Sequence, residues 1–288
     1  METISRLTVL CFAGTYSLAL ASDLTRLVVR NGARWYLTVG LTALGWVVQT
    51  VYLGNLAWRS HKPPITTVFE SLLALSWILA AIDLYLIVRS PKPVAVGLFI
   101  LPVVLALVTV AGLGVPRAGW TSWGGQVFFW GTIHGLFLLA GAVLTCVAFA
   151  AGLMYLVQAN RLKHKRPSRL GLVLPSLEQS ERVNRAAITI AFPLLTFGLL
   201  IGVVLDLVVR KTGTAPIAWT DPKVLSALAM WLVFAVLLHA RYRPAMRGRR
   251  VMLLTVVAFV FMVFTWVGVD LLHLPTAHGV SKSAGRAL

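Results

Sequence analysis

The sequence predicts an all-α polytopic membrane protein, a bundle of about eight transmembrane helices. The chain of 288 residues is 58% hydrophobic and only 12% charged, whereas soluble domains carry about 25% charged residues. Apolar runs long enough for a helix to cross a hydrocarbon core, about 20 residues, recur along the chain. These runs are continuous. They neither alternate, as in a transmembrane barrel, nor show the period of a helix on a soluble domain.

The apolar runs define the expected elements in chain order. The expected spans are 7–28, 35–57, 68–88, 94–113, 129–157, 186–209, 224–242 and 251–272. The first run contains Asp23 and has no small-residue cleavage site, so we expect a retained helix rather than a signal peptide. Residues 174–185 are expected to form a short amphipathic stretch in the connector before the sixth span. No internal repeat or soluble domain is evident, so the chain 1–288 is expected to be one integral membrane domain.

The distribution of lysine and arginine predicts the orientation of the spans. The net charge of +17 comes from 26 Lys+Arg against 9 Asp+Glu. The basic residues gather in every second connector, namely 26–34, 89–93, 161–169 and 241–250. Basic connectors are cytoplasmic and meet anionic lipid head groups, so we expect lipids rather than nucleic acid as partners. Both termini are then extracytoplasmic, and the outward connectors are 58–67, 114–128 and 210–223. Arg59 and Lys62 in the first of them are exceptions to the rule, because they are basic residues on the predicted outer side.

The outward connectors and span ends hold an unusual set of aromatic and histidine side chains. They include Trp120, Trp123, Phe128, Phe129, Trp130, His134, Trp219, His273 and His278. Two neutral imidazoles can ligate a haem iron from opposite faces, and aromatic surfaces can stack on a porphyrin. The competing interpretation is an interfacial aromatic belt, in which tryptophan lies among the lipid head groups. Spacing leaves both interpretations open.

Other ionisable residues lie in or beside the apolar runs. His239 is near the cytoplasmic end of its span, where it is either a functional intramembrane group or an interfacial residue. Glu70 either handles protons or caps a helix. Asp83 and Asp206 have no motif support and are interpreted as structural.

Several function classes have no support in the sequence. Cys11 and Cys146 lie in separate apolar runs without metal-ligand or redox spacing, so we expect small buried residues. No Walker loop, GxSxG, HExxH or Rossmann fingerprint is present, so an ATPase, hydrolase or dehydrogenase has no support. A transporter that uses intramembrane Asp and His would show broken helices or inverted repeats, and neither is evident.

Six stretches occur in the order known from one family. They are "RSHKPPITTVFESLLALSW" (59–77), "WGTIH" (130–134), "LPSLEQSERVNRAAITIAFPLLTFGLLIGVVL" (174–205), "WTDPK" (219–223), "WLVFAVLLHAR" (231–241) and "GVDLLHLPTAH" (268–278). With this ordered set the chain resembles the CcsA/ResC/HemX group of cytochrome c assembly membrane proteins, the haem-handling family with a tryptophan-rich WWD segment. The resemblance covers a core of about 58–280, and the spans within 1–57 are less typical.

The resemblance suggests a role for the stretch 218–223, "AWTDPK". It looks like a remnant of the WWD segment, which in the family lies at the outer membrane surface and contacts haem. Trp219 and Asp221 would therefore contact the cofactor. The chain departs from the family where Val224 replaces a glutamate and where the preceding "GTAPIA" lacks aromatic residues.

The same resemblance assigns the histidines. His134 and His278 would be the two outer ligands of the haem iron. His278 is displaced by one residue relative to the family pattern, so His273 is the alternative second ligand. His239 would match the family's histidine inside the membrane, toward the cytoplasmic side.

The resemblance implies a multi-pass protein of a bacterial plasma (inner) membrane that binds haem b and presents it at the outer face for cytochrome c maturation. Trp219, Trp130 and Trp123 would pack against the porphyrin. A ResB-like membrane protein and apocytochrome c would be partners. Because the chain has no thiol pair, we expect no enzyme on its own, and ligation would belong to a complex. The alternative is a HemX-like membrane regulator of tetrapyrrole biosynthesis that does not deliver haem.

Overall fold

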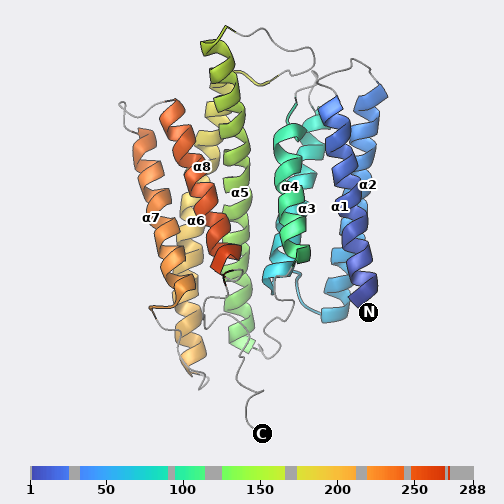
Figure 1. Cartoon of the computed structure of the whole chain (residues 1–288). Coiled ribbons are helices and arrows are strands. Elements are labelled where there is room, and N and C mark those ends of the chain that lie inside the picture. Colours follow the sequence, from blue (N-terminus) through green and yellow to red (C-terminus); the bar gives the residue numbers. More distant parts are fainter. Residues whose placement is uncertain are drawn as a thin grey trace.

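The structure is a computed structural model that describes residues 2–25, 33–89, 95–113, 125–165, 174–211, 219–242, 248–269 and 272. These residues form eight α-helices and a short π-helix, with no strand among them (Figure 1). The elements are α1 (Glu2–Thr25), α2 (Ala33–Ser60), α3 (Val68–Arg89), α4 (Gly97–Leu113), α5 (Gly125–Lys163), α6 (Leu177–Lys211), α7 (Pro222–Tyr242), α8 (Arg249–Val263) and η1 (Phe264–Gly268). The predicted all-α class is confirmed.

The helices run alternately up and down in two groups that meet at α5. Helices α1 to α4 lie together on one side of the bundle, and α6 to α8 lie on the other (Figure 1). α5 contacts α3 and α4 in the first group and α6 and α8 in the second. The lower end in Figure 1, where α1, α3, α5 and α7 begin, is the predicted outer end. The sidedness itself stays a prediction.

Six of the described helices are long and apolar enough to cross a membrane, judged by length and composition. They are α2, α3, α5, α6, α7 and the continuous helix made by α8 and η1. The segments Val9–Thr25 and Gly97–Gly112 are shorter apolar helices. The predicted polytopic helical membrane protein is therefore confirmed.

α5 and α6 are longer than the apolar pattern predicts. With 39 and 35 residues at about 1.5 Å per residue, they measure about 58 and 52 Å, well beyond a hydrocarbon core of about 30 Å. The expected amphipathic stretch 174–185 is not a separate element, because α6 begins at Leu177. Ser176 accepts a bond from the Gln179 amide, and Arg182 pairs with Glu178. Such local pairs stabilise a helix in water, so the helix does not stop where the apolar run does.

Glu70 caps a helix in the structure. Its Oε2 accepts bonds from the Thr66 hydroxyl and amide at 2.7 and 2.9 Å and from the Thr67 amide at 3.2 Å. The Thr67 hydroxyl accepts in return from the Glu70 amide at 3.0 Å. This is a capping box, which is the structural one of the two interpretations of Glu70. Asp206 pairs with Arg210 at 2.7 Å, which is consistent with its interpretation as structural.

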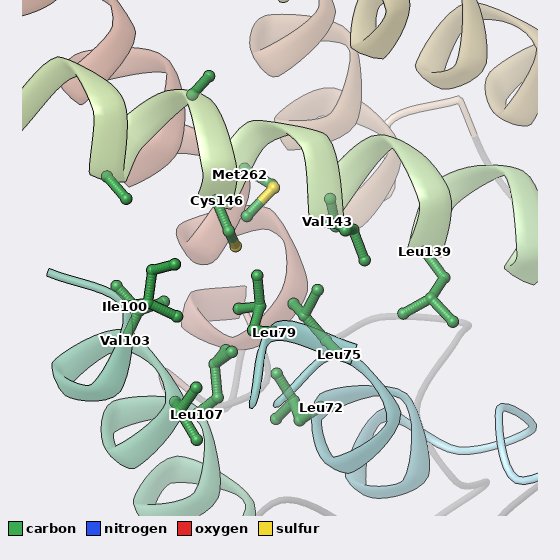
Figure 2. Close-up of a cluster of buried hydrophobic side chains, with 14 of the residues drawn as sticks. Leu72, Leu75, Leu79, Ile100, Val103, Leu107, Leu139, Val143, Cys146 and Met262 are labelled. Atoms are coloured by element: carbon green, nitrogen blue, oxygen red, sulfur yellow. The ribbon is translucent and has the colours of Figure 1, made fainter. Parts of the chain in front are cut away.

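The core lies where α3, α4, α5 and α8 converge. Figure 2 shows leucines of α3 facing α4 side chains and the Leu139, Val143 and Cys146 side chains of α5, with Met262 of α8 beside them. Cys146 is buried as predicted. The expectation for Cys11 was wrong, since it is exposed on α1. An apolar run does not distinguish the lipid-facing side of a membrane helix from its buried side.

Candidate functional site at the predicted outer end

The structure brings part of the predicted site to one end of the bundle. Trp130 and His134 lie in the first turns of α5, and Trp219 and Asp221 directly precede α7. Both helices begin at the predicted outer end (Figure 1). His239 lies in the last turn of α7, at the opposite end. Trp123, His273 and His278 lie outside the described residues, and their assigned roles stay predictions.

The imidazole ring of His134 contacts the backbone of α6. The Nδ1 atom lies 2.7 Å from the carbonyl oxygen of Gly198, and the side chain is half-buried. When Nδ1–H donates to that carbonyl, Nε2 carries the lone pair. A backbone carbonyl that fixes the tautomer and orientation of an imidazole in this way is typical of metal-ligating histidines. The geometry of His134 is therefore suited to ligation through Nε2.

Two glycines of α6 let α5 approach closely, and Gly202 makes room for the His134 ring. A Cβ atom added to Gly202 would lie 2.9 Å from Cε1 of His134, and one added to Gly198 would lie 2.6 Å from Leu138. Gly198 and Gly202 are four residues apart, so they lie on the same face of the helix. Paired small residues at this spacing allow close approach of membrane helices. The resemblance covers the stretch "FGLLIG" (197–202), but the sequence alone did not identify Gly202 as the residue against which His134 packs.

Aromatic and basic side chains surround the start of α5. Trp130 meets Phe129 edge to face, with ring centroids 5.6 Å apart. The ammonium group of Lys62 lies 6.0 Å from the centre of the Phe128 ring, within the range of a cation–π contact. The connector that carries Lys62 also places Ile65 within 3.8 Å of the Cβ position of Gly135, next to His134. Lys62, a basic residue that the positive-inside rule does not expect at the outer end, therefore lies near the aromatic start of α5.

Trp219 and Asp221 differ sharply in exposure. Trp219 is 67% exposed, whereas Asp221 is only 5% exposed. Asp221 accepts a bond from the Lys223 amide at 2.8 Å, and Pro222 is the first residue of α7. Asp at the N-cap followed by Pro at the first helical position is a strong helix start. Asp221 therefore orders the turn that carries Trp219 at the protein surface.

Replacing Asp221 by alanine is expected to lower the free energy of unfolding by about 1 kcal/mol, the usual loss for an N-cap. Asp221→Asn keeps a capping oxygen and should retain most of that stability. Thermal or denaturant unfolding of the two detergent-purified variants measures the difference. Equal losses in both variants would show that the charge of Asp221, rather than the cap, stabilises this turn.

His239 is exposed, but its neighbour Arg241 is buried in a polar cluster at the predicted inner end. The Arg241 guanidinium donates to the side-chain oxygen of Asn184. The Asn184 amide donates to the Ala148 carbonyl at 2.6 Å and lies 3.4 Å from the Thr255 hydroxyl. The four residues come from α5, α6, α7 and α8, so one fully buried asparagine joins all four helices.

Sequence reasoning missed this cluster. Asn184 was quoted only within the amphipathic stretch, and Arg241 was counted with the basic connector 241–250. The available signal was an amide and a hydroxyl, Asn184 and Thr255, facing apolar positions of membrane helices, since buried polar groups require partners. The positive-inside rule assigned Arg241 to a solvated connector, and its 6% exposure corrects that assignment.

Comparison with known proteins identifies the family. The profile described as "Cytochrome C assembly protein" matches residues 65–275. The chain is 28% identical over 285 residues to the cytochrome c biogenesis protein CcsA of Prochlorococcus marinus (strain MIT 9313), covering 89% of this chain and 88% of the relative. It is 27% identical over 294 residues to CcsA of Synechococcus sp. (strain CC9605), covering 93% and 94%.

A differently named relative is also similar. The chain is 22% identical over 227 residues to Protein HemX of Bacillus subtilis (strain 168), covering 78% of this chain and 80% of HemX. No solved structure matches the chain. The family match spans well over half of the sequence, including His134, Trp219 and His239. The chain therefore belongs to the cytochrome c assembly protein family.

Proposed function

We propose that this chain binds haem at the predicted outer end of the bundle and presents it for cytochrome c maturation. The observation that carries the proposal is the contact between Nδ1 of His134 and the Gly198 carbonyl at 2.7 Å. It orients an imidazole as metal-ligating proteins do, in a chain whose family is described as cytochrome c assembly. CcsA relatives that cover about nine-tenths of the chain support the same process.

The described residues fit a haem at this end. His134 would supply one axial nitrogen to the iron. The half-buried ring of Trp130 and the exposed ring of Trp219 offer flat apolar surfaces of the kind that stack on a porphyrin. Lys62 near Phe128 supplies a cation suited to a propionate. His278, or His273 in its place, would be the second axial ligand, and Trp123 a further packing surface.

His239 has a separate place in the proposal. It lies at the predicted inner end of α7, so it is not part of the outer site. We assign it to an inner site through which haem reaches the outer face. Its exposed imidazole can bind a ligand that approaches from the lipid side of α7, whereas Arg241 two residues later is committed to the Asn184 cluster.

Covalent attachment of haem requires partners. Apocytochrome thiols add across the haem vinyl groups, and each sulfur–hydrogen bond is replaced by a thioether and a new carbon–hydrogen bond. Cys11 and Cys146 lie on separate helices and are free thiols, so the chain contributes no pair of its own. Its own residues hold and orient the haem, while a ResB-like membrane protein and apocytochrome c complete the complex. We place this complex in a bacterial plasma (inner) membrane with anionic lipids at its basic end.

The proposal is tested with the wild-type protein, purified in detergent, by visible absorption spectroscopy. A Soret band with sharp α and β bands after reduction, before or after addition of haem b, is expected. In cells, deletion of the gene should remove covalently bound haem from c-type cytochromes, which is seen on haem-stained gels. A protein that takes up no haem after reconstitution would contradict the proposal.

A HemX-like regulator of tetrapyrrole biosynthesis is the second candidate. The similarity to HemX and Val224 after the Trp-Thr-Asp-Pro-Lys stretch favour it. The same deletion strain separates the two functions. Normal c-type cytochromes with altered levels of tetrapyrrole intermediates would support the regulator, whereas loss of c-type cytochromes with unchanged intermediates would support haem presentation.

Gly202→Ala is expected to weaken haem binding by roughly tenfold, a free-energy change of about 1.4 kcal/mol. The new methyl group would lie 2.9 Å from Cε1 of His134, so the ring must move away from its carbonyl partner. Haem titration followed by absorption measures the affinity. Gly54→Ala is the matched control, because an added Cβ there meets nothing within 4 Å. Alanine favours helix formation by up to about 1 kcal/mol relative to glycine, so a weakened affinity in Gly202→Ala would not come from loss of the helix. Unchanged affinity would contradict the role of the space that Gly202 leaves for His134.

A further inference from the structure

Asp83 is a carboxyl group wholly buried in the first group of helices. It lies in α3 with 0% exposure. Neither of its side-chain oxygens has a hydrogen-bond partner among the described residues. Buried polar groups are nearly always hydrogen-bonded, and a charged one is costly unless it is paired. The carboxyl group of Asp83 is therefore expected to bind a proton or a cation, because the described residues offer it no partner.

A second carboxyl group faces the same small space. A Cβ atom added to Gly97 would lie 3.1 Å from Oδ2 of Asp23 and 3.4 and 3.5 Å from the two oxygens of Asp83. Asp23 lies near the end of α1 with 6% exposure, and Gly97 begins α4. The carboxyl groups of α1 and α3 thus meet against Gly97 at the start of α4, where there is no side chain to keep them apart.

Uncharged polar side chains join α1, α2 and α3 within the same group of helices. Tyr16 of α1 donates its hydroxyl proton to Gln49 of α2 at 2.7 Å, and the Gln49 amide donates to Ser76 of α3 at 2.8 Å. α4 contributes no ionisable side chain, and the titratable group of the α5 segment in the core is the Cys146 thiol. In the part of the chain that the structure describes, no ion pair reaches Asp83.

A further hydroxyl lies close to this level of the bundle. Thr42 of α2 is wholly buried, and its oxygen has no hydrogen-bond partner among the described residues. It is one turn from Thr38, whose hydroxyl is 3.0 Å from that of Ser22, the residue before Asp23. The first four helices therefore enclose polar groups near the Asp23–Asp83 space, although no described basic residue pairs with Asp83.

We propose that Asp23 and Asp83 form a proton-binding site within the first four helices, in which Asp83 holds a proton at neutral pH. An ionised carboxylate costs several kcal/mol to bury, even after the protein relaxes. Two carboxyl groups that share a site do not both ionise readily, so one keeps its proton. The site is separate from the proposed haem site, which lies at the other end of the bundle on α5 to α7.

The proton has a structural consequence. With Asp83 neutral, α1, α3 and α4 can pack closely over Gly97. Removal of the proton places a second negative charge in that space, and repulsion then acts between α1 and α3. Binding and release of a proton would thereby be coupled to the packing of these helices, near the predicted inner end where α1 and α3 finish and α4 begins.

Infrared spectroscopy of the full-length protein labelled with carbon-13 at the aspartate carboxyl groups tests this proposal. A protonated carboxyl group shows a C=O stretching band that an ionised carboxylate lacks, and the label assigns the band to aspartate. We expect the band at neutral pH in the wild type and its loss in Asp83→Asn, a neutral group of similar shape. Asp206→Asn is the matched control and should keep the band, because Asp206 is paired with Arg210.

Asp23→Asn should keep the band but shift its frequency, since the neighbour of the protonated group changes. The absence of the band from the wild type at neutral pH would overturn the proposal, and this measurement does not depend on any variant folding. Persistence of the band in Asp83→Asn would place the proton elsewhere. A band that appears only after sodium and potassium are removed would identify a cation site instead of a proton site.

Discussion

His134→Ala is expected to lower haem affinity by roughly 100-fold or more, because loss of an axial ligand exceeds the 10–100-fold effects of outer-shell changes. The imidazole is oriented by the Gly198 carbonyl and packs against Gly202, so its removal takes away both the ligand and this packing. The reduced α and β bands should vanish from the purified protein. Absorption spectra before and after addition of haem b measure the effect.

The control for this experiment is His164→Ala, which removes an exposed histidine beyond the end of α5 and should leave the spectrum unchanged. His278→Ala tests the second ligand. Loss of the bands in both His134→Ala and His278→Ala would establish an outer site with two histidine ligands. Retention of the bands in His278→Ala would point to His273, whereas retention in His134→Ala would contradict the proposed site.

Asn184→Leu is expected to lower the free energy of unfolding by about 3 kcal/mol, the upper range for a hydrogen bond to a charged group. Asn184 is the side chain that accepts a bond from the buried Arg241 guanidinium while it donates to the Ala148 carbonyl. Leucine would fill a similar volume but leave both groups without their partner. Loss of helical circular dichroism during titration with a denaturing detergent measures the change.

Two further variants test the cause of that loss. Thr255→Val should cost less than about 1 kcal/mol, because its hydroxyl lies 3.4 to 3.5 Å from the two side-chain atoms of Asn184 and makes a weaker contact. Asn184→Leu combined with Arg241→Met should be less destabilised than the sum of the single variants, since the stranded charge is gone. Additive losses would show that Arg241 and Asn184 do not act as a pair.

The helical class of the fold could be predicted from the sequence because the chain spans a lipid bilayer. Every backbone polar group within hydrocarbon requires an internal partner, so a long apolar run is a helix, and all eight expected spans correspond to helices. Local chemistry also marks helix starts: the Thr67–Glu70 box begins α3, and Asp221 with Pro222 begins α7. The start of α6 was not predicted because its polar first turns are stabilised by i,i+4 ion pairs, which continue the helix beyond the apolar run.

The sequence likewise predicted part of the candidate site, and the tertiary structure was needed for the rest. Composition and resemblance selected His134, Trp130 and Trp219, because imidazole and aromatic side chains are chemically suited to haem wherever they lie. The apolar runs and basic connectors already predicted that His239 lies at the end opposite His134. Only the tertiary structure shows that His134 meets Gly198, 64 residues away.

Buried polar groups show most clearly what the sequence alone does not determine. In the sequence Asp83 is an acidic residue without a motif, and Arg241 is one basic residue among several in a connector. The structure leaves Asp83 without a hydrogen-bond partner in the described chain and places Arg241 against Asn184 of another helix. Residue type and spacing along one helix determine which face can be apolar, but the free energy of a buried charge depends on atoms of other helices within a few ångströms. Only helix packing decides which atoms those are.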